Sequence, residues 1–91
     1  MKLIEVVRDL GSMDGESAIY TAEPWGQNSE AVVERQPETG LPPEAERLGL
    51  KYFIEVFIAR DFLEDWSATF DVKPTLEQRC ARLIRYAATD A

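Results

Sequence analysis

The densest run of apolar residues in the chain lies between Leu50 and Trp66, LKYFIEVFIARDFLEDW. In the second half of this run, Phe62, Leu63 and Trp66 recur at helical spacing, and charged residues occupy the positions around them. Such spacing is typical of an amphipathic helix that packs one face on a core. The pattern therefore predicts a helix that reaches Trp66.

The first half of the same run is ambiguous, because its β-branched and aromatic residues also alternate as they would in a strand. The alternating residues are Tyr52, Ile54, Val56 and Ile58. A strand would need a turn before the helix begins, yet positions 59–61 contain no glycine, proline or asparagine. We therefore predict one continuous helix over residues 50–66, about 26 Å long at about 1.5 Å per residue, buried at the centre of the fold.

Before this run, the pattern predicts a short helix over Lys2–Leu10 that ends at Gly11. Two short segments of strand composition follow, Ala18–Ala22 and Ala31–Arg35, and the turn-rich segment 23–29, EPWGQNS, separates them. We expect an antiparallel hairpin with a long loop. Because two strands alone are marginally stable in water, their apolar face must lie on helices or their edges must pair with another chain.

Further along, a proline-rich connector leads to Pro43, which is favoured at the first position of a helix and predicts a short helical turn as far as Arg47. Gly49 should separate that turn from the central helix. Near the end of the chain, Thr75 and Gln78 have the spacing of a capping box, which predicts a last helix. The apolar stripe of this helix consists of Leu76, Cys80, Leu83, Ile84 and Ala87.

These elements predict an α+β fold, in which a small antiparallel hairpin or sheet is packed by a long central helix and two shorter helices. Ninety-one residues, with 45% apolar and 30% charged side chains, suit a single compact domain over residues 1–91. No internal repeat or low-complexity segment divides the chain.

Three stretches carry a resemblance: Ala22–Trp25, Tyr52–Arg60 and the predicted helix after Pro74. On these stretches the chain resembles small acidic bacterial proteins of uncharacterised function. The resemblance spans most of the chain and implies no activity, so no functional residue follows from it.

The chain is acidic, with 17 carboxylate side chains against ten basic ones and a net charge of −7. This charge disfavours binding to nucleic acid or to an anionic membrane, because both would be repelled. We find no apolar span long enough to cross a bilayer and no signal-peptide core. Cys80 is the one cysteine and cannot form an internal disulfide, which agrees with a reducing compartment. We therefore expect a cytoplasmic protein.

The chain lacks histidine, which removes the usual base for a serine or cysteine nucleophile and the usual zinc ligands. It also lacks the glycine-rich loops that bind phosphates. We expect no cofactor, and whether the protein is an enzyme stays open, with the balance against it. The carboxylates Asp61, Glu64 and Asp65, at i, i+3 and i+4, could hold a metal ion or act as acid and base. The competing interpretation is a solvated helix face.

Two features of the last helix have a functional and a structural interpretation. Cys80 is either a small core residue or a reactive thiol, and its place on the apolar stripe favours the core. Arg79, Arg82 and Arg85 recur every three residues and form a cationic strip. The strip could bind a carboxylate, a phosphate or an RNA backbone, but pairing with the carboxylates of the protein itself is the commoner arrangement.

Trp25 is the first candidate for a binding residue, because it lies in a turn-rich loop beside Glu23, Gln27 and Asn28. A tryptophan on an exposed loop commonly anchors an interface. The alternative is that Trp25 folds back and caps the core, which would recover its burial energy.

Together these observations favour a small, non-enzymatic binding protein, such as an accessory, regulatory or inhibitor-like module of the immunity-protein or antitoxin kind. It would use its acidic surface and the Trp25 loop to bind a protein partner of basic charge. Two alternatives stay open. One is a small metal- or carboxylate-dependent enzyme, and the other is a structural subunit that forms a homodimer through an edge of the hairpin.

Overall fold

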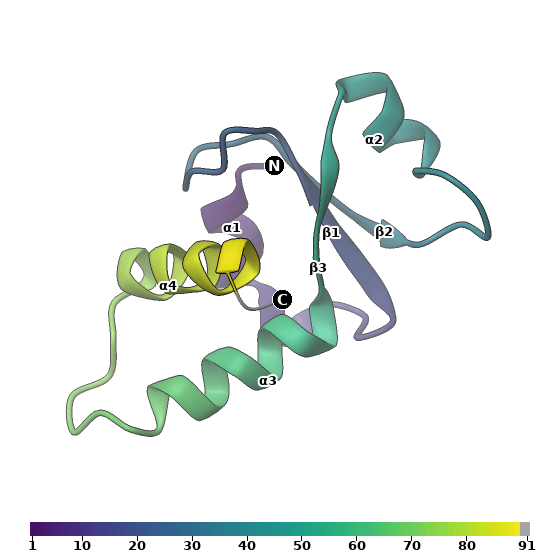
Figure 1. The fold of residues 1–91 in the computed structure, drawn as a ribbon. Helices are drawn as coiled ribbons and strands as arrows, with labels where there is room; N and C mark the ends of the chain where they lie inside the picture. The colour runs from purple at the N-terminus through teal and green to yellow at the C-terminus, as the bar shows by residue number, and fades with distance from the viewer. Residues whose placement is uncertain (90–91) are drawn as a thin grey trace.

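A three-stranded antiparallel sheet lies at the centre of the computed structural model, which describes residues 1–89 (Figure 1). The strands are β1 (Ser17–Thr21), β2 (Ala31–Arg35) and β3 (Lys51–Glu55). Their spatial order is β2-β1-β3, so the first strand of the predicted hairpin is the middle strand and the third strand pairs with its other side.

Helices cover both faces of this sheet (Figure 1). The elements are α1 (Leu3–Arg8), the 3-10 turn η1 (Leu10–Ser12), α2 (Pro43–Leu48), α3 (Val56–Ser67) and α4 (Leu76–Thr89). One face packs on α1, α3 and α4, and the other face packs on α2. The predicted α+β class is therefore confirmed. Within residues 1–89, no helix combines the length and the apolar character needed to span a membrane.

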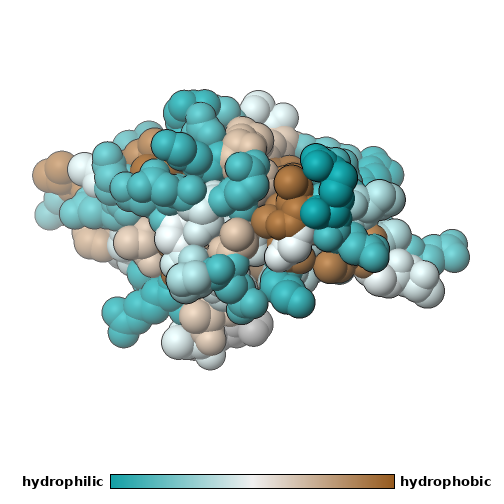
Figure 2. All heavy atoms as spheres, turned by 90° about the horizontal axis from the view of Figure 1, so that it is seen from above, coloured by the Kyte–Doolittle hydropathy of each residue, from teal (hydrophilic) through white to brown (hydrophobic). Residues whose placement is uncertain are grey.

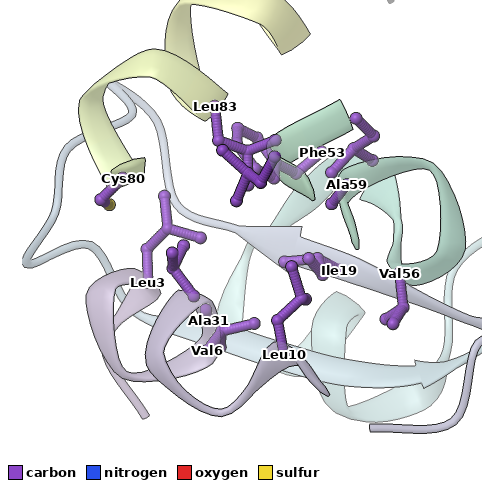
Figure 3. Close-up of a cluster of buried hydrophobic side chains, with 13 residues drawn as sticks. Leu3, Val6, Leu10, Ile19, Ala31, Phe53, Val56, Ala59, Cys80 and Leu83 are labelled. Atoms are coloured by element: carbon purple, nitrogen blue, oxygen red, sulfur yellow. The ribbon is translucent and has the colours of Figure 1, made fainter. Parts of the chain in front are cut away.

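The main core lies between the sheet and α1, α3 and α4. In Figure 3 the side chain of Leu3 on α1 lies close to those of Cys80 and Leu83 on α4, while Ile19 of the central strand lies farther to the right, beside Leu10. All five side chains are buried. A smaller cluster on the opposite face joins the sheet to α2, and its buried members are Ala18, Tyr20, Ala45 and Leu50.

The predicted continuous helix over residues 50–66 is wrong. Residues Lys51–Glu55 form β3, and α3 begins at the next residue, Val56. No turn separates the two elements, because Glu55 is still extended (φ −74°, ψ 145°) and the chain enters the helix directly after it. The absence of glycine, proline or asparagine in this region therefore did not exclude a strand.

A β-bulge in β3 explains why the sequence pattern was ambiguous. Ile54 lies opposite Ile19 and Tyr52 lies opposite Tyr20, so Phe53 is an extra residue between two consecutive pairs. A bulge disturbs the alternation of side chains between the two faces. Phe53 and Ile54, although adjacent, both belong to the main core.

The other predicted elements agree with the structure. The hairpin of β1 and β2, the short helix at Pro43 and the last helix are confirmed. The capping box is present, since the backbone N–H of Thr75 donates to Gln78 Oε1 (2.8 Å) and that of Gln78 donates to Thr75 Oγ1 (3.1 Å). The first helix is also confirmed, but Gly11 does not cap it, because it lies inside η1.

Candidate functional site: the outer edge of strand β3

The outer edge of β3 has no strand beside it in the part of the chain that the structure describes. β3 pairs only with β1 on its inner side, and no backbone hydrogen bond from elsewhere in residues 1–89 reaches positions 51–55. An edge of this kind presents peptide N–H and C=O groups that can pair with an extended chain.

A small hollow of about 280 Å³ lies beside this edge. Residues 52–54 of β3 form one side of it, Trp25 from the β1–β2 loop contributes a second, and Ile58, Tyr86 and Ala87 complete it from α3 and α4. The hollow is mainly apolar and aromatic, as binding sites for side chains commonly are.

Trp25 is half-buried. This exposure lies between the two alternatives drawn from the sequence, an exposed interface anchor and a side chain that caps the core. Its ring meets that of Phe53 edge to face, with the centroids 4.8 Å apart and the planes at 89°. Its indole Nε1 is enclosed and donates to no acceptor within residues 1–89. The indole therefore helps to cap the core and also forms a wall of the hollow.

The loop that carries Trp25 is tied to the first helix. The backbone N–H of Leu3 donates to Ser29 O and that of Ile4 donates to Gln27 O, both at 2.9 Å. Within the loop, Ser29 Oγ accepts from the N–H of Gly26 (2.9 Å) and donates to Pro24 O (3.1 Å). These bonds fix the loop against α1, and the contact with Phe53 places the indole beside β3.

The side chains of Glu23, Gln27 and Asn28 are exposed on the same loop, and none of them lines the hollow. The structure therefore separates the four predicted binding residues. Trp25 lies beside the edge of β3, and the other three form polar surface around it.

Tyr52 and Tyr86 belong to the site but were not among the residues selected from the sequence. Tyr52 is 41% exposed and meets Tyr20 edge to face at 6.1 Å, and partial burial raises the pKa of its hydroxyl. Tyr86 stacks on Phe62 with the centroids 4.0 Å apart. The alternation around Tyr52 could have indicated an edge strand, but the continuous-helix prediction concealed it.

The carboxylates Asp61, Glu64 and Asp65 are all exposed on α3. Within residues 1–89, no three carboxylate or cysteine side chains gather in a way that could hold a metal ion. Their arrangement matches the solvated helix face that amphipathic helices usually present.

Cys80 is fully buried in the main core, and burial raises the pKa of its thiol to about 11. A thiol with so high a pKa is almost entirely protonated near neutral pH and is a poor nucleophile. The core interpretation of Cys80 is therefore confirmed.

The three arginines of α4 have different surroundings. Arg79 lines a small hollow beside Leu10 and Gly11, whereas Arg82 lies over the ring of Phe62, with Cζ 4.9 Å from the centroid. Arg85 is exposed. None of the three forms an ion pair with another group in residues 1–89, so the pairing expected from the sequence is absent from this part of the chain.

Hydrophilic side chains cover most of the face shown in Figure 2, and hydrophobic ones appear there in separate small areas. Large continuous apolar patches mark many interfaces, whereas small separate areas are ordinary on protein surfaces. No protein-family model, no curated protein and no solved structure matches the chain. The resemblance to small acidic bacterial proteins stays an expectation from the sequence.

Proposed function

We propose that this protein is a non-enzymatic, cytoplasmic binding module that captures an extended segment of a partner protein along the outer edge of β3. The observation that carries the proposal is the coincidence of an edge strand without a neighbour in residues 1–89 and an apolar hollow directly beside it. In such binding, main-chain hydrogen bonds supply affinity and pockets for alternate side chains supply specificity.

The geometry of the aromatic residues supports this mode of binding. Trp25, Phe53 and Tyr86 each pack on another ring or line the hollow together, so little conformational freedom is lost when a partner side chain enters. Tyr52 also lines the hollow and, at 41% exposure, offers a further aromatic contact.

The net charge of −7 supports a partner of basic charge, because opposite charges accelerate encounter and disfavour acidic competitors. The exposed carboxylate of Glu23 lies in the loop next to Trp25 and is available for such contacts. An inhibitor of a basic protein, of the immunity-protein or antitoxin kind, is the form of this function that fits the charge.

Site-directed photo-cross-linking tests the proposal. A benzophenone amino acid replaces Tyr52 in one variant and Phe57 in the other, because these aromatic residues are similarly exposed (41% and 48%) but only Tyr52 lines the hollow. After capture from bacterial lysate, peptide mapping identifies the cross-linked partner segment. We expect the variant at position 52 to cross-link to one extended, basic segment. The variant at position 57 should not cross-link to that segment.

Hydrogen exchange on the purified complex provides the second measurement. Those backbone amides of residues 51–55 that point to the outer edge should exchange more slowly in the complex, because the added strand accepts hydrogen bonds from them. Equal cross-linking at positions 52 and 57, or unchanged exchange in β3, would contradict the proposal. If the cross-linked segment comes from a second copy of the chain, the structural-subunit alternative replaces it.

A further inference from the structure

A second hollow, separate from the edge of β3, lies between Trp66 at the end of α3, the 68–75 segment and α4. Its volume is about 580 Å³, within the range of about 300–1,000 Å³ that is usual for small-molecule sites. We call it the α3–α4 groove. It shares no lining residue with the hollow beside Trp25.

One wall of the groove is apolar and stands partly open to solvent. Trp66 meets Phe70 edge to face at 4.9 Å, and Val72 and Pro74 continue the wall along the connecting segment. Phe70 is 47% exposed and Val72 is 82% exposed. Contact with an apolar ligand would remove the exposed apolar surface of these side chains from water, which is favourable in free energy.

The charge of the groove is opposite to that of the whole molecule. Lys73, Arg82 and Arg85 line it, and no aspartate or glutamate does, although acidic residues outnumber basic ones in the chain. Within residues 1–89 these three cations form no ion pair, whereas other arginines pair with a carboxylate. Those arginines are Arg8, Arg35 and Arg47.

Arg82 is held in place before any ligand binds. Its guanidinium lies over Phe62, and Phe62 in turn stacks on Tyr86 at an interplanar angle of 13°. Its Nη1 is enclosed and has no acceptor in the described residues. A guanidinium that is already ordered loses less entropy when it pairs with a carboxylate, and such pairs are among the stronger hydrogen-bonded contacts.

We propose that the α3–α4 groove binds a small amphipathic anion. The apolar body of the ligand lies against Trp66, Phe70 and Val72. Its carboxylate head lies near the three cations of the groove, Lys73, Arg82 and Arg85. A purely apolar occupant would leave the cations without a counter-charge, and a cationic one would be repelled. The site is independent of the proposed strand capture, because the two surfaces have no residue in common.

Dodecanoate is the probe, titrated below its micelle concentration into the isotope-labelled protein and followed by amide NMR shifts and calorimetry. Dodecyltrimethylammonium, which has the same apolar chain with a positive head, is the counter-probe. If the net charge of the protein determined binding, the cation would bind more tightly. If the proposed groove determines it, the anion binds more tightly, so the order of affinity of the two probes separates these explanations. We expect one-to-one binding of dodecanoate, with shifts in residues 66–85 and no comparable binding of the cation there.

Arg85→Gln and Lys73→Gln should each weaken dodecanoate binding at least about fivefold, since each removes one charge-assisted contact. Both side chains are exposed, so folding should persist. Arg79→Gln is the matched control, because Arg79 lies on the same helix but outside the groove. The affinity of this variant for dodecanoate should stay within about twofold of that of the original protein.

Three results would overturn the proposal. They are no binding of dodecanoate, binding that is indifferent to Arg85 and Lys73, and tighter binding of the cationic counter-probe to the same residues. Concentration-dependent shifts of residues 66–85 without any ligand would also overturn it, because a second copy of the chain would then occupy the groove.

Discussion

At the scale of single residues, an aromatic side chain can serve the core and the surface together. The sequence presents capping and binding as alternatives for Trp25, because composition alone does not reveal how a loop returns to the body of the protein. In the structure the ring packs edge-on against Phe53 and still lines a hollow at the edge of β3. The two roles are compatible because one edge of a large ring is buried while another borders open space.

The Cys80 thiol allows a direct test at this scale. Its pKa of about 11 leaves about one thiolate in a thousand at pH 8, and burial also blocks access. We expect Cys80 to react with a disulfide reagent at least about a hundredfold more slowly in buffer than in concentrated urea. A rate in buffer close to the unfolded rate would contradict the buried position.

The raised pKa also has a consequence for stability. Because folding raises it, the unfolded chain loses this proton first as the pH increases. The free energy of unfolding should therefore decline as the pH rises from about 9 towards about 11, and this contribution should be missing in Cys80→Ala.

At the scale of elements, local signals in the sequence identified most of the structure. The capping box at Thr75 and Gln78, the proline at position 43 and the turn-rich loop between β1 and β2 each act through nearby backbone atoms, so their effects can be read from a few residues. The strand at 51–55 could not be read in this way. Its partner β1 is about thirty residues away in the chain, and the bulge at Phe53 hides the alternation.

The surfaces proposed for binding depend on tertiary packing even more strongly. Tyr52 on β3 and Tyr86 on α4 line one hollow, and no local pattern relates positions so far apart in the chain. Lys73 and Arg85 line one groove because residues of the 68–75 segment and of α4 form its walls together. Sequence spacing showed that α4 carries three arginines, but not which of them would share a wall with apolar residues.

Gly49 tests the connection between α2 and β3. It has a positive φ of 71°, and its N–H and that of Leu50 donate to carbonyls in the last turn of α2. Because a Cβ strains this conformation, Gly49→Ala should lower the free energy of unfolding by about 1 kcal/mol, measured as a lower urea midpoint with an unchanged slope.

Gly11→Ala is the control for that experiment. A Cβ at position 11 would meet no atom within 4 Å, and the backbone of Gly11 has no positive φ. Gly11→Ala should change the free energy of unfolding by no more than about 0.5 kcal/mol. Equal losses in the two variants would show that the left-handed conformation of Gly49 is not the cause.

At the scale of the whole molecule, the excess of carboxylates should oppose folding. The described part measures 42 × 24 × 23 Å. The Debye length is about 30 Å in 0.01 M salt and about 8 Å in 0.15 M salt, so repulsion acts across most of the molecule only in the more dilute solution. We expect the melting temperature to rise by about 2–5 °C between these two conditions.

The charge-reversal variant Glu38→Lys/Glu46→Lys is the comparison, because both side chains are exposed and form no ion pair within residues 1–89. Lower net charge should make its melting temperature less sensitive to salt. A melting temperature that falls with salt in the original protein would show that favourable ion pairs outweigh the repulsion.

The packing of α1 against α4 bears on how the protein is made in the cell. Leu3 is among the earliest core residues to leave the ribosome and Leu83 is among the latest, yet both fill the same core (Figure 3). A nascent chain that lacks α4 would leave the apolar side chains of α1 and α3 that pack on this helix exposed to water. Folding of this domain should therefore finish only after α4 has left the ribosome, and chains truncated before Leu76 should depend on chaperones or be degraded.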